Sequence, residues 1–194
     1  MENRNNQKII LSISIVSFNT KSLLEQCLYS ILGNSENLNL EIFVVDNGSN
    51  DGTIEMVREK FPKVKLIKNS KNFYFSKAHN QALRVAAGKY FLILNSDTVI
   101  PPNSLEKMFQ FNKGHPEIAA ASCRQVDENG KVDYTCSRFP TPIIEFFESN
   151  LIGKLFKNQK LLSNYRYGNW KRDSIKLVDV IPGSFLLART EIIK

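Results

Sequence analysis

Two aspartates in this chain stand at or shortly after the ends of apolar runs, where a carboxylate can meet a ligand. Asp46 closes the run that ends Phe-Val-Val-Asp, and Asp97 follows residues 90–94 after one short polar step. A run without polar alternation is typical of a strand covered on both faces of a parallel sheet. Open α/β sheets bind ligands in the crevice outside the carboxyl ends of their strands. We therefore expect Asp46 and Asp97 to face one crevice.

Two kinds of chemistry suit this pair of carboxylates. An ionised carboxylate only accepts hydrogen bonds, so it can receive them from a nucleotide base or a ribose. Beside a diphosphate it can also hold Mg²⁺ or Mn²⁺, which bind one or two carboxylates together with substrate phosphates. The alternative for Asp97 is a capped turn. Asp51 is a better candidate for tightening the turn before a helix that begins near Thr53.

Several other reaction classes lack their motifs here. The chain has no Walker loop, no GxGxxG after its first strand and no GxSxG. Of its two histidines, His115 is expected in an exposed turn, whereas His79 could point into the crevice or pack in the core. Three cysteines without CxxC spacing (Cys27, Cys123 and Cys136) indicate reduced thiols rather than a zinc site or a disulfide framework.

The composition favours an ordinary globular chain with anionic partners. Of 194 residues, 26 are Lys or Arg and 19 are Asp or Glu, for a formal net charge of +7. The basic residues are scattered, with the densest group at 63–71, which favours a solvated surface over a nucleic-acid stripe. Residues 1–8 are polar and expected to be disordered, and no run approaches a membrane span. These features favour a cytoplasmic protein and leave contact with the inner face of a membrane open.

The first part of the chain alternates strands and helices. The pattern predicts strands at 9–18, 41–45, 64–67 and 90–94, and helices from Thr20 or Ser22 to Gly33, 53–60, Ser76 to Ala87 and 103–112. Such alternation predicts an α/β fold with an open, mainly parallel sheet, flanked by helices and joined by right-handed crossovers.

The second part is less regular. A turn signature at 127–130 predicts a hairpin or small antiparallel extension between 118–123 and 132–136. We expect a helix over 143–156, a loop over the site at 157–176, and a last strand over 178–187 that Pro182 interrupts. A further helix is expected to start at Thr190.

Five motifs in a fixed order resemble those of the family-2 glycosyltransferases, inverting nucleotide-sugar enzymes of GT-A fold, and are most similar to the bacterial rhamnosyltransferase type. They are Ser-Ile-Val-Ser-Phe-Asn at 14–19, Val-Val-Asp-Asn-Gly-Ser-Asn-Asp-Gly-Thr at 44–53, the asparagine-rich loop at 69–83, Leu-Asn-Ser-Asp-Thr at 94–98 and the strand motif at 178–189. The resemblance implies a GT-A domain over residues 9–194, with its C-terminal part missing.

The resemblance also implies roles for individual residues. Asp97 would bind the metal, Mg²⁺ or Mn²⁺, and Gly183 and Ser184 would line the acceptor side. Asp46 would contact the nucleotide base, and the other residues implied at the nucleotide are Ser17, Phe18, Asn19, Asn47, Lys77, Asn95 and Ser96. The implied partners are a UDP-, dTDP- or GDP-sugar and a glycan or lipid-linked acceptor, with no nucleic acid.

Three departures from the family pattern matter. Asn95 replaces the first acid of the family's DxD motif, and Tyr74 stands where its loop has glycine. The family's catalytic base would lie beyond Lys194, because Glu191 is too close to the last strand. A non-catalytic nucleotide-sugar-binding module is therefore the alternative to an enzyme. A nucleic-acid-binding domain rests on the net charge alone, and a sugar nucleotidyltransferase would need a glycine-rich N-terminal loop.

Overall fold

A computed structural model describes residues 9–35, 38–149 and 159–194 of the chain. The chain divides into two compact units, one of residues 1–121 and 183–194 (unit 1) and one of residues 122–182 (unit 2). The N-terminal segment 1–8, expected to be disordered, lies outside the described residues.

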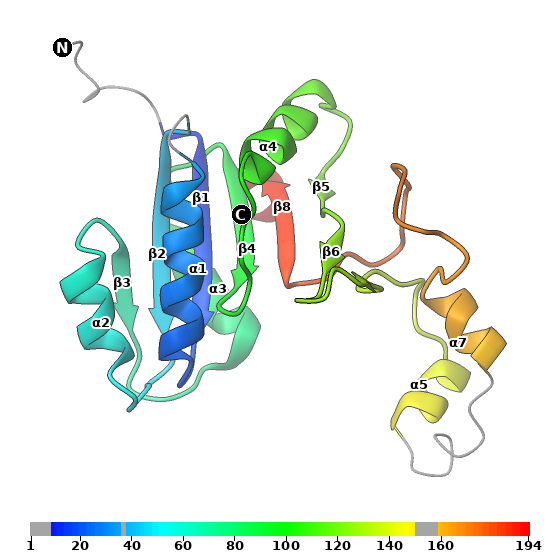
Figure 1. Ribbon diagram of the computed structural model, residues 1–194, viewed down its shortest axis with the longest axis horizontal. Coiled ribbons are helices and arrows are strands. Elements are labelled where there is room, and N and C mark those ends of the chain that lie inside the picture. The colour runs from blue at the N-terminus through cyan, green and yellow to red at the C-terminus, as the bar shows by residue number, and fades with distance from the viewer. Residues whose placement is uncertain (1–8, 36–37, 150–158) are drawn as a thin grey trace. The chain divides into compact units, whose positions relative to one another are not determined.

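Unit 1 is built on a six-stranded mixed sheet in the order β3-β2-β1-β4-β8-β5 (Figure 1). Its strands are β1 (Leu11–Ser17), β2 (Leu40–Asp46), β3 (Lys65–Lys68), β4 (Tyr90–Asn95), β5 (Ala120–Ala121) and β8 (Phe185–Arg189). Strands β1 to β4 pair in parallel, and β8 runs antiparallel to both β4 and β5. The mainly parallel open sheet predicted from the sequence is confirmed.

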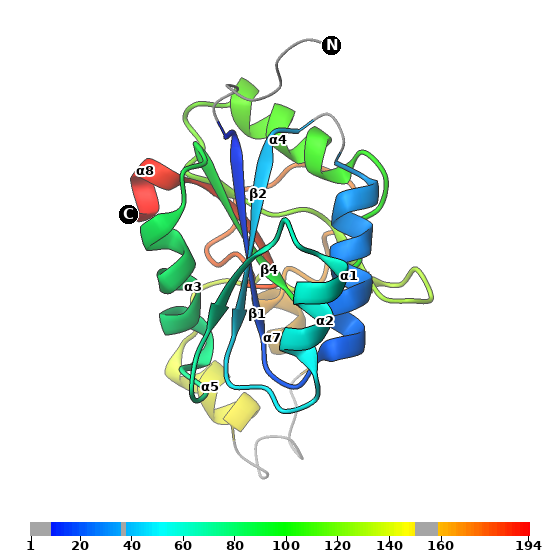
Figure 2. The same ribbon diagram turned by 90° about the vertical axis from the view of Figure 1, so that its left-hand side faces the viewer.

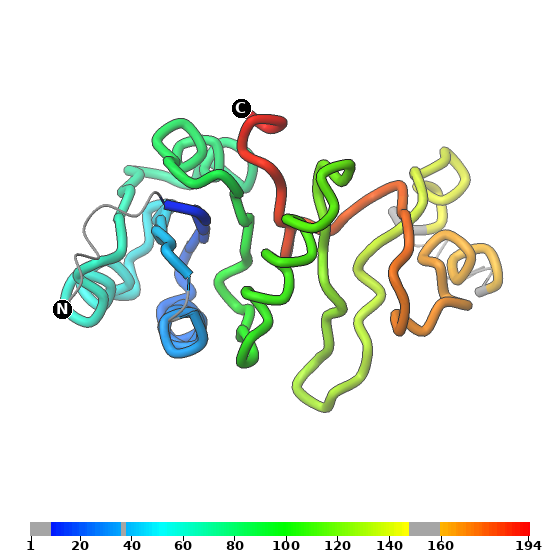
Figure 3. The backbone as a smooth tube through the Cα atoms, turned by 90° about the horizontal axis from the view of Figure 1, so that it is seen from above, coloured from blue at the N-terminus to red at the C-terminus, as the bar shows by residue number. Residues whose placement is uncertain are grey.

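Helices cover both faces of this sheet (Figure 2). Helices α1 (Lys21–Gly33) and α2 (Thr53–Lys60) lie on one face, and α3 (Tyr74–Val85) and α8 (Thr190–Ile193) on the other. Seen from above, α4 (Ser104–Gly114) lies on the same side of the sheet as α1 (Figure 3). Its Phe109 meets Tyr90 of β4 edge to face at 5.4 Å between ring centroids.

The composition of β1 explains why α3 can approach the sheet closely. Leu11, Ile13 and Ile15 alternate with small serines, and all of these side chains are buried. Ser14 meets His79 of α3, and Ser12 Oγ accepts the backbone N–H of Gly88 at 2.9 Å. Small side chains on this face therefore leave room for the helix and for the turn that follows it.

Two elements of unit 1 begin at other residues than the sequence predicts. Helix α3 begins at Tyr74, not at Ser76, because Asn72 Oδ1 accepts the N–H of Tyr74 at 2.7 Å and so closes the first turn earlier. Strand β8 begins only at Phe185, after Pro182, which lacks a donor for the ladder. Val180 makes just an isolated bridge with Ser137 inside unit 2.

Unit 2 contains a small antiparallel pair and two short helices. Its elements are β6 (Gln125–Val126), β7 (Val132–Asp133), α5 (Pro142–Ser149) and α7 (Gln159–Tyr165). The hairpin predicted around 127–130 is present, but its strands are shorter than predicted, and Ala120–Ala121 pairs with β8 instead. The segment expected as a loop over 157–176 includes α7, and the predicted helix over 143–156 extends beyond the described residues. None of the described helices is long and apolar enough to cross a membrane.

Candidate functional site

The loops after β1, β2 and β4 meet at one edge of the sheet, because these strands are parallel neighbours. A chain of hydroxyl groups joins them. Ser17 Oγ and Thr20 Oγ1 lie 2.9 Å apart, and Thr20 Oγ1 donates to Ser96 Oγ at 3.1 Å. The polar steps that follow two of the buried strands are therefore in direct contact, and Ser17 and Ser96 lie close together.

Asp46, at the end of β2, is fully buried, and its two carboxylate oxygens differ. Oδ2 accepts the backbone N–H groups of Gly48 at 3.1 Å and Ser49 at 3.0 Å. Oδ1 is buried and has no hydrogen-bond partner in the described part of the chain. A buried carboxylate oxygen without a donor is costly, so this atom is available for a donor that a ligand brings.

The turn after Asp46 is fastened to the start of α1. Asn19, at a left-handed φ of 55°, donates its N–H to Ser49 Oγ and accepts the N–H of Asn50 at its side chain. Asp51 accepts the N–H of Lys21 and both the N–H and the hydroxyl of Thr53. The prediction that Asp51 tightens this turn is confirmed, and these contacts fix the backbone around Asp46.

Asn47 connects the same edge to the asparagine-rich loop. Its Oδ1 accepts Asn69 Nδ2 at 3.0 Å, its Nδ2 donates to Asn72 Oδ1 at 3.1 Å, and the residue is 2% exposed. Asn69 also exchanges two amide hydrogen bonds with Gln81 of α3. The side chain of Asn47 is thus used in holding the loop, and the residue stays a predicted nucleotide contact.

The loop that Asn47 holds presents two lysines around one aromatic ring. Lys77 Nζ lies 4.4 Å and Lys71 Nζ 5.7 Å from the ring centroid of Phe73, and both lysines are exposed. Cation–π contact steadies the two long side chains while their charges stay in solvent. The charge of Lys77 is thus exposed at this edge, and contact with a diphosphate stays a prediction from the family resemblance.

Asp97 is exposed in the turn after β4, where Thr98 N–H donates to the carbonyl of Asn95 at 3.3 Å. Among the described residues, no three His, Cys, Asp or Glu side chains gather as a metal site. A single exposed carboxylate fits Mg²⁺ or Mn²⁺ only as a shared ligand, with phosphates and water completing the shell. The donor set therefore fits a metal that arrives with a diphosphate.

Cys27 and His79 lie close to this edge, but both are buried. Burial, with the nearby charge of Asp97 second, raises the pKa of the Cys27 thiol to about 12. Burial lowers the pKa of His79 to about 4. His79 Nδ1 lies 2.8 Å from Ser14 Oγ, and its ring meets Phe75 at 4.4 Å. Both groups are uncharged near neutral pH, and His79 packs against its neighbours.

The segment before β8 joins the site at the end of β4. Asn95 N–H donates to the carbonyl of Ser184 at 3.1 Å. A Cβ built on Gly183 would lie 2.7 Å from Cζ of Phe75, so the glycine lets the ring approach. Gly183 and Ser184, predicted on the acceptor side, thus lie at the same edge as Asn95.

Glu191 lies at the opposite edge of the sheet. In the antiparallel pair, Phe185 faces Leu94 at the carboxyl end of β4 and Arg189 faces Tyr90 at its amino end. Glu191 follows Arg189, and its side chain is 74% exposed. The position of Glu191 agrees with the expectation that it does not serve as the base.

Three residues of this edge are missed by reading the sequence. Thr20 connects two loops, Phe73 carries the lysines, and Phe75 lies against Gly183. The sequence offers a signal for Phe73 and Phe75 only, since both stand inside the asparagine-rich motif.

The family model for glycosyl transferase family 2 matches residues 12–190. This chain belongs to glycosyl transferase family 2. It is 26% identical over 187 residues to the uncharacterized glycosyltransferase MJ1057 of Methanocaldococcus jannaschii, covering 85% of this chain and 64% of that protein. It is 35% identical over 127 residues to a dolichol-phosphate mannosyltransferase of Pyrococcus furiosus, covering 63% and 35%.

A solved structure of similar fold is the Pyrobaculum calidifontis mannosyltransferase PcManGT in complex with GDP-Man and Mn²⁺. It is 27% identical with a TM-score of 0.54, covering 61% of this chain and 36% of that one. S. aureus TarS in complex with UDP-GlcNAc has a TM-score of 0.56 at 24% identity, covering 63% of this chain and 36% of that one, and shows the fold alone. The chain spans less than two thirds of the length of each of these proteins. The GT-A architecture implied by the resemblance is confirmed.

Proposed function

We propose that this chain supplies the donor site of an inverting, metal-assisted glycosyltransferase that moves a sugar from a nucleotide-sugar to a glycan or lipid-linked acceptor. The observation that carries the proposal is the buried, unpartnered Oδ1 of Asp46 at the carboxyl edge of the sheet. A hydrogen-bond acceptor that is buried away from water can recognise a hydrogen-bond donor of a ligand, and the N–H of a nucleotide base is a suitable donor.

The hydrogen bonds of Asp46 favour one class of base. Because Oδ2 already accepts two backbone N–H groups, the carboxylate offers a ligand only Oδ1. A single imide N–H, as in uracil or thymine, needs one such acceptor. Guanine presents two parallel donors that pair best with both oxygens of a carboxylate. We therefore favour UDP- or dTDP-sugars over GDP-sugars, although the PcManGT structure contains GDP-Man.

The residues around the diphosphate would act by charge. A bound Mg²⁺ or Mn²⁺ would neutralise the negative charge that develops on the departing diphosphate. Asp97 would hold it with the phosphates, and Asn95 stands where the family has the first acid of its DxD motif. Lys77 would attract the same diphosphate from the asparagine-rich loop. Inversion needs a general base, in this family a carboxylate, that takes the proton from the acceptor hydroxyl.

The acceptor side would form around Gly183 and Ser184. The relatives that suggest an acceptor class are the P. furiosus dolichol-phosphate mannosyltransferase and a poly(ribitol-phosphate) beta-glucosyltransferase of Bacillus spizizenii, the latter 26% identical over 165 residues. Their names point to lipid-linked and phosphate-bearing acceptors.

A thermal-shift screen of UDP-, dTDP- and GDP-sugars with Mn²⁺ tests the proposal. A ligand at 100 times its dissociation constant stabilises the folded state by about 2.7 kcal/mol. We expect a rise in Tm with a UDP- or dTDP-sugar that is larger with Mn²⁺ than without it. The proposal fails if no nucleotide-sugar raises the Tm, with or without the metal.

A further inference from the structure

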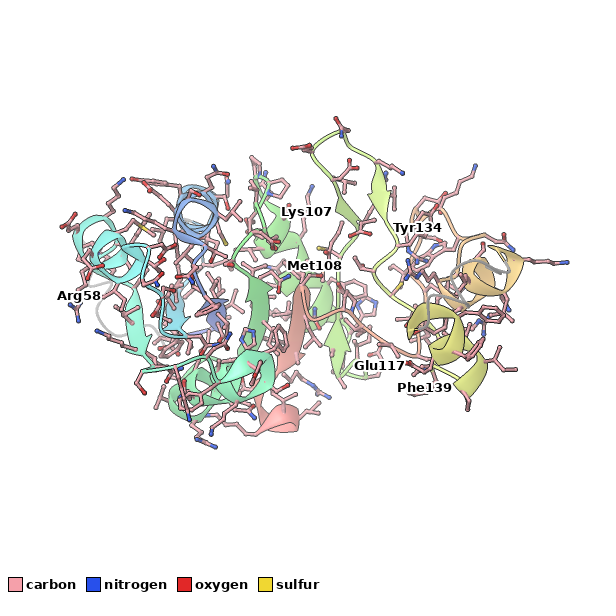
Figure 4. The ribbon with its side chains drawn as sticks, turned by 90° about the horizontal axis from the view of Figure 1, so that it is seen from below. Arg58, Lys107, Met108, Glu117, Tyr134 and Phe139 are labelled. Carbon is pink, nitrogen blue, oxygen red and sulfur yellow. The ribbon has the colours of Figure 1, made fainter. Side chains whose placement is uncertain are left out.

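Unit 2 contains a group of cationic and aromatic side chains that the donor site does not use. We name it the cation–aromatic cluster; its members are Tyr134, Arg138, Tyr167, Trp170, Arg172 and Lys176. Tyr134 follows β7, and Figure 4 labels it there together with Phe139, which precedes α5. All six residues belong to residues 122–182, so the cluster lies within a single compact unit.

Arg172 is the buried centre of the cluster, 8% exposed. Its Cζ lies 4.3 Å from the ring centroid of Trp170 and 5.1 Å from that of Tyr134. Its Nη2 donates to the carbonyl of Arg166 at 2.7 Å, and its Nη1 to the carbonyl of Tyr167 at 3.5 Å. Carbonyl groups and rings solvate the guanidinium, and no carboxylate among the described residues forms an ion pair with it.

Two exposed cations approach the same rings. Arg138 Cζ lies 4.8 Å and Lys176 Nζ 4.9 Å from the ring centroid of Tyr167, and Lys176 Nζ is also 5.6 Å from that of Trp170. Both side chains are exposed, so a ligand can reach them from solvent. Three positive charges therefore converge on two neighbouring rings.

No carboxylate pairs with these three cations within the part of unit 2 that the structure describes. The nearby Asp179 accepts the N–H of Phe139 at 3.2 Å. Like charges gathered around the same rings repel, and burial of Arg172 strengthens the repulsion. An anion among the three would relieve it.

Backbone strain occurs at the same residues. Tyr167 and Arg172 have φ values of 51° and 60°, a left-handed conformation that costs a non-glycine residue free energy. A loop that only connects two elements can avoid this strain by having glycine at its left-handed positions. Strain at two members of the cluster indicates that the positions of the ring and the guanidinium matter.

We propose that the cation–aromatic cluster is a second anion site, which binds a phosphate group of a phosphodiester or pyrophosphate. Arg138 and Lys176 would contact the phosphate oxygens, since charge-assisted hydrogen bonds to phosphate are strong. Arg172 would contribute its field and hold Trp170 in place. Use of this site for a phosphate-bearing acceptor rests on the proposed function, but phosphate binding itself does not.

Trp170 makes the site observable, because it is the only tryptophan of the chain. The experiment titrates the full chain with inorganic pyrophosphate in EDTA and follows tryptophan emission. We expect a saturable change, and at least a tenfold weaker affinity in Lys176→Gln and in Arg138→Gln, because a charged hydrogen bond of about 1.4 kcal/mol or more is lost. Lys131→Gln, a matched change of an exposed lysine in the same unit, should bind as the wild type does.

The source of the phosphate is distinguished by a second arm with vesicles of neutral lipid or of anionic phospholipid. A response to pyrophosphate that vesicles do not reproduce indicates a water-soluble phosphate compound, and a response to anionic vesicles alone indicates a lipid headgroup. In either arm, the proposal requires that Lys176→Gln binds at least tenfold more weakly than the wild type. Absence of any response in both arms, or unchanged affinity in Lys176→Gln and Arg138→Gln with wild-type circular dichroism, overturns the proposal. A failure of Asp46 to bind a nucleotide-sugar would not change the response of the cation–aromatic cluster to phosphate. The two proposals can therefore fail independently.

Discussion

Gly183 lies against the ring of Phe75, so close that a Cβ on the glycine would come within 2.7 Å of Phe75 Cζ. This contact joins the segment before β8 to the first turn of α3. It links a predicted acceptor-side residue to the motif that carries Lys77.

Gly183→Ala should therefore destabilise unit 1 through Phe75. The ring is 43% exposed and can partly move away, so we expect a loss of about 1 kcal/mol in the free energy of unfolding. In a Phe75→Ala background the same change should cost almost nothing, a coupling of at least about 0.5 kcal/mol in a double-mutant cycle. Gly114→Ala, with no atom within 4 Å, is the control. Additive effects would mean that the contact is unimportant.

Tyr74→Gly should stabilise the protein. Tyr74 has a φ of 60° and is 79% exposed, so the substitution removes a strained conformation and little packing. Relief of roughly 1–2 kcal/mol is offset in part by the greater entropy that glycine loses on folding, for a net gain of about 0.5–1 kcal/mol. Ser76→Gly, at an ordinary helical position of α3, should instead destabilise by about 0.5 kcal/mol. Urea unfolding decides; a less stable Tyr74→Gly would contradict the strain argument.

The order of β1 to β4 and of the helices between them was predictable because each strand is rich in Ile, Leu, Val or Phe and each helix carries an apolar stripe. The conformation of Tyr74 was not, since the family resemblance marks a glycine there but the residue type favours negative φ. The start of α3 depends on Asn72 Oδ1, a contact that periodicity does not show.

The site was predictable to the level of which loops meet, since parallel strands bring Asp46 and Asp97 to one edge. The difference between the two carboxylate oxygens of Asp46 could not be predicted, because it depends on hydrogen bonds that the N–H groups of Gly48 and Ser49 donate to Oδ2. The cation–aromatic cluster could not be predicted either, because Tyr167 and Trp170 stand in a segment that the sequence predicts as a loop, and a tertiary contact brings Arg138 to Tyr167.

Glu41 gives the stability of the protein a pH dependence in the acid range. Burial would raise the pKa of Glu41, but hydrogen bonds from Lys65 and Ser12, and from the N–H of Ala87, outweigh it and lower the pKa. A lowered pKa in the folded state means a contribution that is present above the unfolded value of about 4.3 and lost as pH falls through the folded value.

Glu41→Gln should cost about 1–3 kcal/mol at pH 7, because an amide N–H₂ would face the Lys65 ammonium. The difference in the free energy of unfolding between Glu41→Gln and the wild type, measured by urea unfolding, should be smaller at pH 3 than at pH 7. Glu117→Gln, an exposed residue labelled in Figure 4, should change stability by less than about 0.5 kcal/mol. An equal gap at both pH values would contradict the charged role of Glu41.

Gly88→Ala should be among the most damaging small substitutions in unit 1. A Cβ there would lie 2.5 Å from the backbone nitrogen of Ser12, and backbone of a central strand cannot move aside. Overpacking of this kind costs about 1–3 kcal/mol. Gly33→Ala, at the end of α1 with no atom within 4 Å, should be neutral or slightly stabilising. Thermal unfolding of the two variants side by side tests this; equal Tm values would be the contrary result.

We propose that Asp46 recognises the nucleotide base and that Asp97 binds the metal, and calorimetric titration of UDP with and without Mn²⁺ tests these two roles most directly. Asp46→Asn keeps one oxygen for Gly48 and Ser49 but puts a donor in place of Oδ1, so UDP affinity should fall at least tenfold with or without Mn²⁺. Asp97→Asn should abolish the gain from Mn²⁺ and leave metal-free affinity unchanged. An Asp46→Asn variant that binds UDP like the wild type, or an Asp97→Asn variant that keeps the full effect of Mn²⁺, would contradict the account.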